Sequence, residues 1–132
     1  MKIKPIVLVQ EPYLYKDKPL LRIPNYNLHY NGKRTRTLIA IPSHYKAFLY
    51  NEISDKDITI LLLEEEVSSE ETKNPFKVLI VSVYLDILDK NVISLGLGKC
   101  AAFAKDNQIP MILGMDSNSH STLWGCDENN SR

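Results

Sequence analysis

The chain has 132 residues, of which 44% are hydrophobic and 24% are charged, and this composition is that of one small globular domain, not of a disordered chain. Sixteen basic residues balance sixteen acidic residues, which excludes the overall positive charge that many nucleic-acid-binding proteins carry. Any contact with DNA would therefore depend on local basic patches and on a metal ion.

The first predicted element is a strand over residues 5–10, which is apolar on both faces and rich in branched side chains. Such a strand is expected to be covered on two sides. Pro12 cannot continue a strand ladder, so Glu11 is expected to be the last strand residue, with its carboxylate at the exit of the strand. That carboxylate is either a solvated surface group or part of a site.

Residues 15–24 are charged and show no period, and they predict a loop. The segment 26–30 alternates weakly between apolar and polar residues. It ends at Asn31-Gly32, a turn signal that predicts a hairpin into a second strand over residues 35–41.

The compact basic cluster of the chain lies in this hairpin and consists of Lys33, Arg34 and Arg36. Basic side chains on an edge strand block aggregation, so one interpretation is a solvated hairpin edge. The other interpretation is contact with phosphate groups. His29 is expected to be structural.

Three segments follow in the middle of the chain. Residues 43–50 are predicted to form a short helix that Ser43 caps. Residues 57–63 begin with a branched side chain and are predicted to form a strand. The acidic residues between 64 and 71 predict a solvated turn and no metal site, because adjacent carboxylates on an exposed loop repel one another.

A strand, a helix and a strand are predicted next. Residues 76–84 are apolar on both faces, which indicates a central strand. Residues 91–107 form a predicted helix, with Asn91 as its cap and apolar residues on one face. The short apolar run 109–113 lies between a proline and a glycine and predicts a buried strand that leads to Asp116. These segments form a βαβ-like unit.

Three polar side chains stand at the ends of buried strands, namely Glu11, Tyr84 and Asp116. The carboxyl ends of such strands tend to share one edge of a sheet, which predicts a site there. Asn118 would present an amide on the same side as Asp116 if the chain stays extended. The alternative is an ordinary turn closed by the Asp, Ser and Asn side chains.

Residues 116–125 read Asp-Ser-Asn-Ser-His-Ser-Thr-Leu-Trp-Gly, and residues 129–132 read Asn-Asn-Ser-Arg. Residues 10–13 read Gln-Glu-Pro-Tyr, and a Val-Tyr pair ends the strand 76–84. Together these motifs resemble the endonuclease domain of non-LTR retrotransposons of the R1 and Jockey type. That domain belongs to the endonuclease/exonuclease/phosphatase superfamily.

The resemblance implies a Mg²⁺-dependent (or Mn²⁺-dependent) hydrolysis of DNA phosphodiesters. Glu11 would hold the metal, and Asp116 would position or deprotonate the attacking water. Asn118 and Tyr84 would hydrogen-bond the scissile phosphate. His120 is included among the candidate catalytic residues and is expected to orient its loop, and Trp124 is expected to fill the core.

The resemblance covers nearly all of this chain but only the middle of the family's domain. The family domain opens with an additional strand that carries an asparagine near the metal, and it closes with an aspartate and a histidine that this chain lacks. We therefore expect one partial domain over residues 1–132, a DNase I-like α/β sandwich with a mixed sheet and flanking helices. The catalytic set of this chain is incomplete.

The expected function is nicking of target DNA for reverse transcription, in an element whose reverse transcriptase lies outside this chain. The alternatives are a non-catalytic remnant that binds nucleic acid or a partner, and another phosphodiesterase or phosphatase of the superfamily. Cys100 and Cys126 match neither a disulfide framework nor a zinc site, which indicates a reducing, intracellular compartment. Neither a membrane span nor a signal peptide is predicted, and a retrotransposon endonuclease would act in the nucleus.

Overall fold

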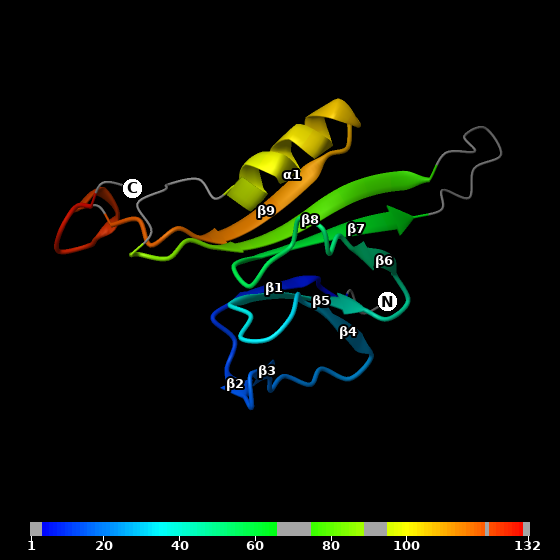
Figure 1. Ribbon diagram of the computed structural model, residues 1–132, viewed down its shortest axis with the longest axis horizontal. Coiled ribbons are helices and arrows are strands. Elements are labelled where there is room, and N and C mark those ends of the chain that lie inside the picture. The colour runs from blue at the N-terminus through cyan, green and yellow to red at the C-terminus, as the bar shows by residue number, and fades with distance from the viewer. Residues whose placement is uncertain (1–3, 66–74, 89–94, 121, 131–132) are drawn as a thin grey trace.

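The structure is a computed structural model that describes residues 4–65, 75–88, 95–120 and 122–130. Two β-sheets face each other, and one helix covers the outer face of the larger sheet (Figure 1). The elements in chain order are β1 (Val7–Gln10), β2 (Leu14–Tyr15), β3 (Lys18–Pro19), β4 (Tyr26–His29), β5 (Thr37–Pro42), β6 (Lys46–Leu49), β7 (Ile58–Glu65), β8 (Phe76–Tyr84), α1 (Leu95–Asp106), β9 (Met111–Asp116) and the 3-10 turn η1 (Thr122–Trp124).

The smaller sheet has the order β1-β5-β4, and all its pairs are antiparallel. Strands β4 and β5 pair antiparallel as predicted, but the loop 30–36 joins them and not a tight turn at Asn31-Gly32, although Gly32 has a positive φ of 70°. All six residues of β5 are buried, because β5 lies between the other two strands and against the larger sheet. All four residues of β1 are half-buried, so this edge strand is less covered than predicted.

The larger sheet has the order β6-β7-β8-β9. Strands β7 and β8 are antiparallel over their full length, whereas β8 and β9 are parallel and are joined through α1. The predicted βαβ unit is therefore confirmed. Its register places Tyr84 opposite Asp116, so both residues stand at the same end of the sheet.

Both faces of β7 and β8 are apolar because each face meets a separate part of the core. The core between the two sheets contains Ile39, Ile41, Leu61, Leu63, Val78 and Ile80. The core between the larger sheet and α1 contains Ile58, Ile60, Leu62, Leu79, Val81, Val83, Leu85, Cys100 and Ala104. A strand with alternating side chains that is apolar throughout fits only such a central position.

Several predicted elements are different in the structure. Residues 43–50 do not form a helix, because 46–49 pair with β7 as strand β6 and alternate between exposed and half-buried side chains. The predicted loop 15–24 contributes to the small β2–β3 hairpin. The predicted acidic turn does not begin at residue 64, since Glu64 and Glu65 belong to β7. The rest of that turn falls in residues 66–74, which lie outside the described part.

The predicted helix 91–107 is confirmed from residue 95 to residue 106, and residues 91–94 lie outside the described part. Strand β9 is confirmed as a strand but not as a buried one. It pairs only with β8 and stands at the edge of the larger sheet. Ile112, Leu113 and Met115 are consequently 56%, 39% and 45% exposed.

Gly114 of β9 allows β1 to pack closely against the larger sheet. A Cβ atom at this position would lie 2.7 Å from Leu8 Cδ2, so we expect Gly114→Ala to lower the free energy of unfolding by about 1–3 kcal/mol through overpacking. Gly98→Ala is the matched control, because a Cβ at Gly98 in α1 meets open space and should stabilise the helix by about 1 kcal/mol. Urea unfolding measures both changes, and a Gly114→Ala protein as stable as the wild type would contradict the close packing.

Candidate functional site

One end of the sandwich collects the polar groups that the sequence singled out, and we call this end the rim. Strands β1, β8 and β9 end there, and β5 and β7 begin there, as the antiparallel and parallel registers require. The two sheets are joined just below the rim by Gln10, whose Nε2 donates to Ser82 Oγ at 2.9 Å and to the Gly114 carbonyl at 3.4 Å. Glu11, Tyr84 and Asp116 therefore follow strand ends that lie at one edge of the molecule.

Hydroxyl groups continue this polar layer between the sheets. Thr37 Oγ1 and Thr59 Oγ1 are 2.8 Å apart, and both side chains are fully buried. Ser82 Oγ donates in turn to the carbonyl of Val9 at 3.2 Å. Buried polar groups stabilise a structure only when they are paired, so these bonds fix how the two sheets are placed beneath the rim.

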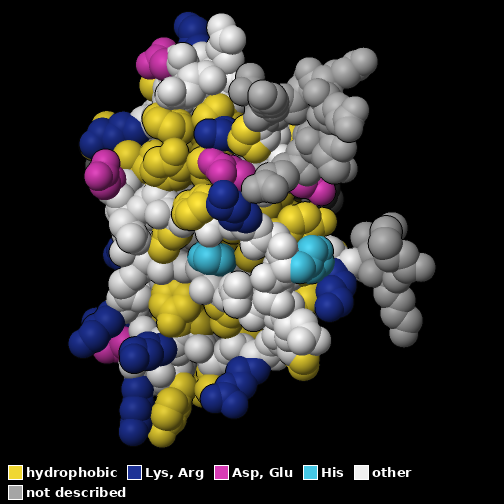
Figure 2. Space-filling model, turned by 90° about the vertical axis from the view of Figure 1, so that its right-hand side faces the viewer, with side chains coloured by type: hydrophobic (Ala, Val, Ile, Leu, Met, Phe, Trp, Pro, Cys, Tyr) yellow, Lys and Arg dark blue, Asp and Glu magenta, His cyan; other side chains and the backbone are white. Residues whose placement is uncertain are grey.

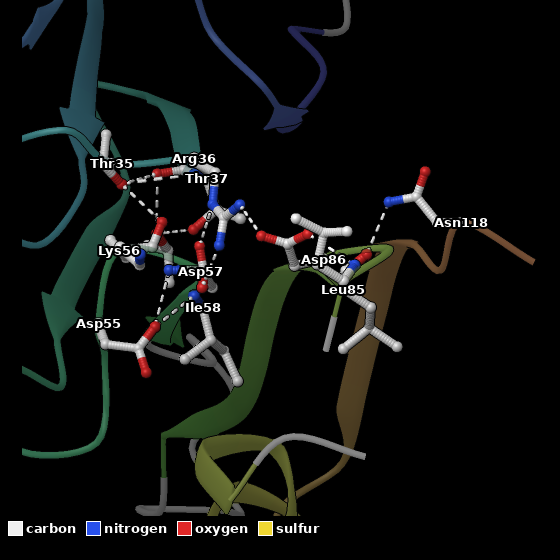
Figure 3. A network of polar contacts seen from close by, with 12 residues as sticks. Thr35, Arg36, Thr37, Asp55, Lys56, Asp57, Ile58, Leu85, Asp86 and Asn118 are labelled. Atoms are coloured by element: carbon white, nitrogen blue, oxygen red, sulfur yellow. Dashed lines mark hydrogen bonds and ion pairs between the residues drawn. The ribbon is translucent and has the colours of Figure 1, made fainter. Parts of the chain in front are cut away.

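Arg36, directly before β5, lies at the centre of a network at the rim (Figure 3). Its Nε and Nη2 donate to the two carboxylate oxygens of Asp57 at 2.5 and 2.6 Å, and its Nη1 donates to Asp86 Oδ2 at 2.6 Å. The guanidinium carbon lies 4.7 Å from the centre of the Tyr84 ring, which is a cation–π distance. The hydrogen bond to Asp57 is the main reason that the pKa of Arg36 is raised, and Asp86 adds to it.

The predicted basic cluster is thus divided in the structure. Arg36 is held by two carboxylates, while Arg34 forms an exposed ion pair with Asp17 at 2.9 Å and Lys33 is exposed. The Arg36 hydrogen bond is likewise the first cause of the lowered pKa of Asp86, and the Leu88 N–H that donates to this carboxylate is the second. Asp86 is therefore ionised wherever the chain is folded at neutral pH.

Glu11 stands on the opposite sheet from Tyr84 and Asp116. Its backbone N–H donates to the Arg36 carbonyl at 2.8 Å, and its side chain is exposed. The φ angle of Glu11 is +50°, a region that L-residues other than glycine and asparagine rarely adopt. Six other non-glycine residues of the described chain, among them Lys16, Asn25 and Gln108 in loops, also have a positive φ, so the angle alone does not single out Glu11.

Asp116 and Asn118 form a turn at the exit of β9. Asp116 Oδ1 accepts the backbone N–H of Asn118 at 3.0 Å, and Asn118 has a φ of +48°. The chain is therefore not extended here, and the expectation that the two side chains would follow a strand-like alternation is wrong. Instead, the amide Nδ2 of Asn118 donates to the Leu85 carbonyl at 2.6 Å, which ties the chain after β9 to the chain after β8.

The loop that carries His120 is closed by two asparagines from further along the chain. Asn130 Oδ1 accepts the His120 N–H at 2.9 Å, and Asn129 Oδ1 accepts the Thr122 N–H at 2.8 Å. The imidazole of His120 is exposed. These bonds give a structural reason for the two asparagines after the loop. They involve the backbone N–H of His120 and not its imidazole ring. The predicted place of Trp124 in the core concerns a side chain outside the described part.

The opposite end of the sandwich offers a second polar region, which faces the viewer in Figure 2. An open groove of about 310 Å³ lies there between His44, Tyr45, Lys46, Glu64 and Glu65. Glu64 is neutralised by Lys46 at 3.7 Å and by Lys77 at 3.3 Å. Figure 2 shows acidic, basic and hydrophobic side chains interspersed among the described residues of this face.

The residues at the rim suit a hard divalent cation in their chemistry. Mg²⁺ prefers a small number of carboxylate oxygens and keeps several waters, and Glu11 and Asp116 supply carboxylates from two different sheets. The described residues contain no cluster of three or more histidine, cysteine or acidic side chains around a metal position. Any ion here would therefore depend on two carboxylates at most and on water or substrate for its remaining ligands.

Two further features bear on the setting of the chain. Cys100 and Cys126 are both free, and burial raises the pKa of the Cys100 thiol. Within the described ranges, no helix has the length and apolar character to cross a lipid bilayer.

The sequence did not reveal the importance of Arg36, Asp57, Asp86, Gln10 and Ser82. Asp57 begins the predicted strand 57–63 and Asp86 lies two residues after the predicted strand 76–84, so their place near strand ends was visible. Both carboxylates contact one arginine because of how the strands pair, and the sequence pattern does not predict that pairing.

Comparison with known proteins yields a structural likeness. No protein-family model matches the sequence, and no curated protein does so. A solved structure, "Endonuclease domain of TRAS1, a telomere-specific non-LTR retrotransposon", is similar with a TM-score of 0.60 at 19% sequence identity, over 96% of this chain and 52% of that chain. The chain thus has a mixed α/β fold that fits part of a DNase I-like domain and spans about half the length of that neighbour.

Proposed function

We propose that this chain is the endonuclease domain, or part of it, of a non-LTR retrotransposon of the R1 and Jockey type. The observation that carries the proposal is the position of the motif residues in a fold similar to that of such an endonuclease. At the rim, Tyr84 and Asp116 are the last residues of β8 and β9, and Glu11 and Asn118 follow the ends of β1 and β9. The substrate would be DNA, which such an element meets in the nucleus, and its reverse transcriptase would lie elsewhere.

The proposed reaction is hydrolysis of a phosphodiester by water. Tyr84 is half-buried at the end of β8, and its hydroxyl can donate to a phosphate oxygen. Asn118 uses one amide hydrogen for the Leu85 carbonyl, and a primary amide has a second one for the phosphate. Asp116 keeps one carboxylate oxygen for Asn118 and would use the other to orient or deprotonate the attacking water.

A metal ion fits the charge balance of this reaction. Arg36 and Lys56 balance Asp57 and Asp86, and Glu11 and Asp116 add negative charge at the same rim. Such a rim repels a phosphodiester unless a cation lies between them. Glu11 would hold Mg²⁺ or Mn²⁺, which when bound supplies a Lewis acid for the phosphate oxygens. His120 would act from its loop, as a positioning group or as a proton donor.

Nicking of supercoiled plasmid by the purified chain tests this proposal. We expect conversion to the open-circular form in about 5 mM Mg²⁺, a millimolar concentration because a site with few carboxylates binds Mg²⁺ weakly. We expect no conversion after chelation with EDTA. An inositol phosphate serves as a second substrate. Phosphate release from it without plasmid nicking would replace the proposal by a phosphatase of the same superfamily.

A second candidate function is favoured by the exposed apolar side chains of β9. An unpaired strand edge with exposed Ile112, Leu113 and Met115 can accept a strand from another polypeptide. In that case the chain would be a non-catalytic module that binds nucleic acid or a protein. Binding of DNA without metal and without nicking, by a chain shown to be folded, would favour this function over the first.

A further inference from the structure

Arg36 contacts the rim through its backbone as well as through the ion pairs of its side chain. Its backbone carbonyl accepts the N–H of Glu11 at 2.8 Å, so the strained residue after β1 is anchored to it. Its side chain reaches across to the larger sheet, where it pairs with Asp57 before β7 and with Asp86 after β8. One residue of the smaller sheet therefore holds three strand ends in place.

These contacts engage all three nitrogens of the guanidinium and three of its five N–H groups. Nε and both terminal nitrogens each donate to a carboxylate, and the side chain is 26% exposed. By contrast, the nearby Arg34 has a side chain that is 79% exposed and a single partner. The side chain of Arg36 is thus oriented by two carboxylates, whereas that of Arg34 is held by one exposed ion pair.

The contacts of Arg36 extend to the remaining candidate residues. Its guanidinium lies against the ring of Tyr84, which restricts how the ring can rotate. Asp86 directly follows Leu85, whose N–H donates to the Asp116 carbonyl at 2.8 Å. The Leu85 carbonyl accepts the amide of Asn118 at 2.6 Å. Figure 3 shows this path from Arg36 through Asp86 and Leu85 to Asn118.

We propose that Arg36 is a positioning residue, which fixes Glu11 on one sheet relative to Tyr84, Asp116 and Asn118 on the other. This inference rests on the proposed function of the rim. Catalytic groups must be held within about 0.5 Å of their productive geometry, and a displacement of about 1 Å can cost on the order of 100-fold in rate. The backbone N–H of Arg36 also donates to the Lys56 carbonyl before β7, and the side chain adds the link to Asp86 after β8.

Arginine is required for this role, and lysine cannot replace it. The planar guanidinium binds Asp57 through two parallel hydrogen bonds while its third nitrogen binds Asp86. A lysine ammonium is a point charge on a flexible stem and cannot hold both carboxylates in one plane against the Tyr84 ring. Arg36→Lys therefore keeps the positive charge and removes the planar group that binds both carboxylates.

The test compares Arg36→Lys with Arg34→Lys, the matched exchange at an exposed arginine. The first measurement is amide hydrogen exchange at Glu11 and Leu85, whose N–H groups extend the β1–β5 and β8–β9 ladders at the rim. We expect Arg36→Lys to speed exchange there at least about tenfold beyond the change at central amides of β7 and β8, since local opening is separable from global unfolding. The second measurement is plasmid nicking, where kcat should fall about tenfold or more with KM within about threefold.

The outcomes separate this inference from the function on which it rests. Faster exchange at the rim together with a lower kcat supports both. Faster exchange in a protein whose wild type does not nick DNA leaves Arg36 as the residue that positions the rim and overturns the endonuclease function. Unchanged exchange at Glu11 and Leu85, or an unchanged kcat in an active protein, overturns the role of Arg36. Arg34→Lys should match the wild type in both measurements.

Discussion

Asp116→Asn is expected to lower the rate of Mg²⁺-dependent plasmid nicking by about 100-fold to 1,000-fold or more, the usual cost of removing a group that acts on the transition state. Asparagine is the sharpest replacement, because its Oδ1 can still accept the N–H of Asn118 and close the turn after β9. The exchange thus removes the negative charge and the proton-accepting group while it keeps the local structure.

The matched control is Asp106→Asn at the exposed end of α1, which should leave nicking unchanged. Circular dichroism and urea unfolding would verify that both variants are folded. Nicking by Asp116→Asn at the wild-type rate would show that the cleavage arises elsewhere on the chain or from a contaminating nuclease. It would also remove Asp116 from the site.

Arg36→Ala is expected to have the largest effect on stability, a loss of about 2–3 kcal/mol in the free energy of unfolding. Breaking a buried ion pair by removing one partner costs about 3–5 kcal/mol because a charge is left without compensation. The side chains of Arg36, Asp57 and Asp86 are 26%, 25% and 31% exposed, so water reduces this cost in part. Urea unfolding at neutral pH measures it.

Arg34→Ala is the control for this prediction, and its cost should stay below about 1 kcal/mol because exposed ion pairs contribute little. A second control removes the charges left behind. Combining Arg36→Ala with Asp57→Asn and Asp86→Asn should recover part of the lost stability, since neutral amides cost less to leave without the arginine than carboxylates do. Equal costs for Arg36→Ala and Arg34→Ala would contradict the central place of Arg36.

The sequence predicted those parts of the fold that depend on local pattern. Strands β7 and β8 are apolar on both faces, and this property alone places them at the centre of a sheet. The strand ends before Pro12 and after Gly114 were visible because proline and the polar loop residues interrupt the pattern. The parallel pairing of β8 and β9 accounts for Tyr84 and Asp116 standing together, whereas Glu11 reaches the same rim from the other, antiparallel sheet.

Other parts depend on contacts that a linear pattern does not record. Residues 43–50 contain residues compatible with a helix, and pairing with β7 makes 46–49 a strand. The apolar run of β9 predicts burial, yet the pattern does not say whether a neighbour lies on both sides. Arg36 looked like one of three basic loop residues because its partners lie 21 and 50 positions away.

The polar layer below the rim also has a consequence for how the chain folds. Gln10 bonds to Ser82 and Gly114 across 72 and 104 positions of sequence, whereas β7 and β8 are adjacent strands. Closing a long loop costs conformational entropy before the new contact contributes any stabilising energy, so contacts of this kind tend to form late. The site should therefore be assembled last, after a nucleus around β7 and β8, and refolding monitored at Tyr84 should lag behind secondary structure.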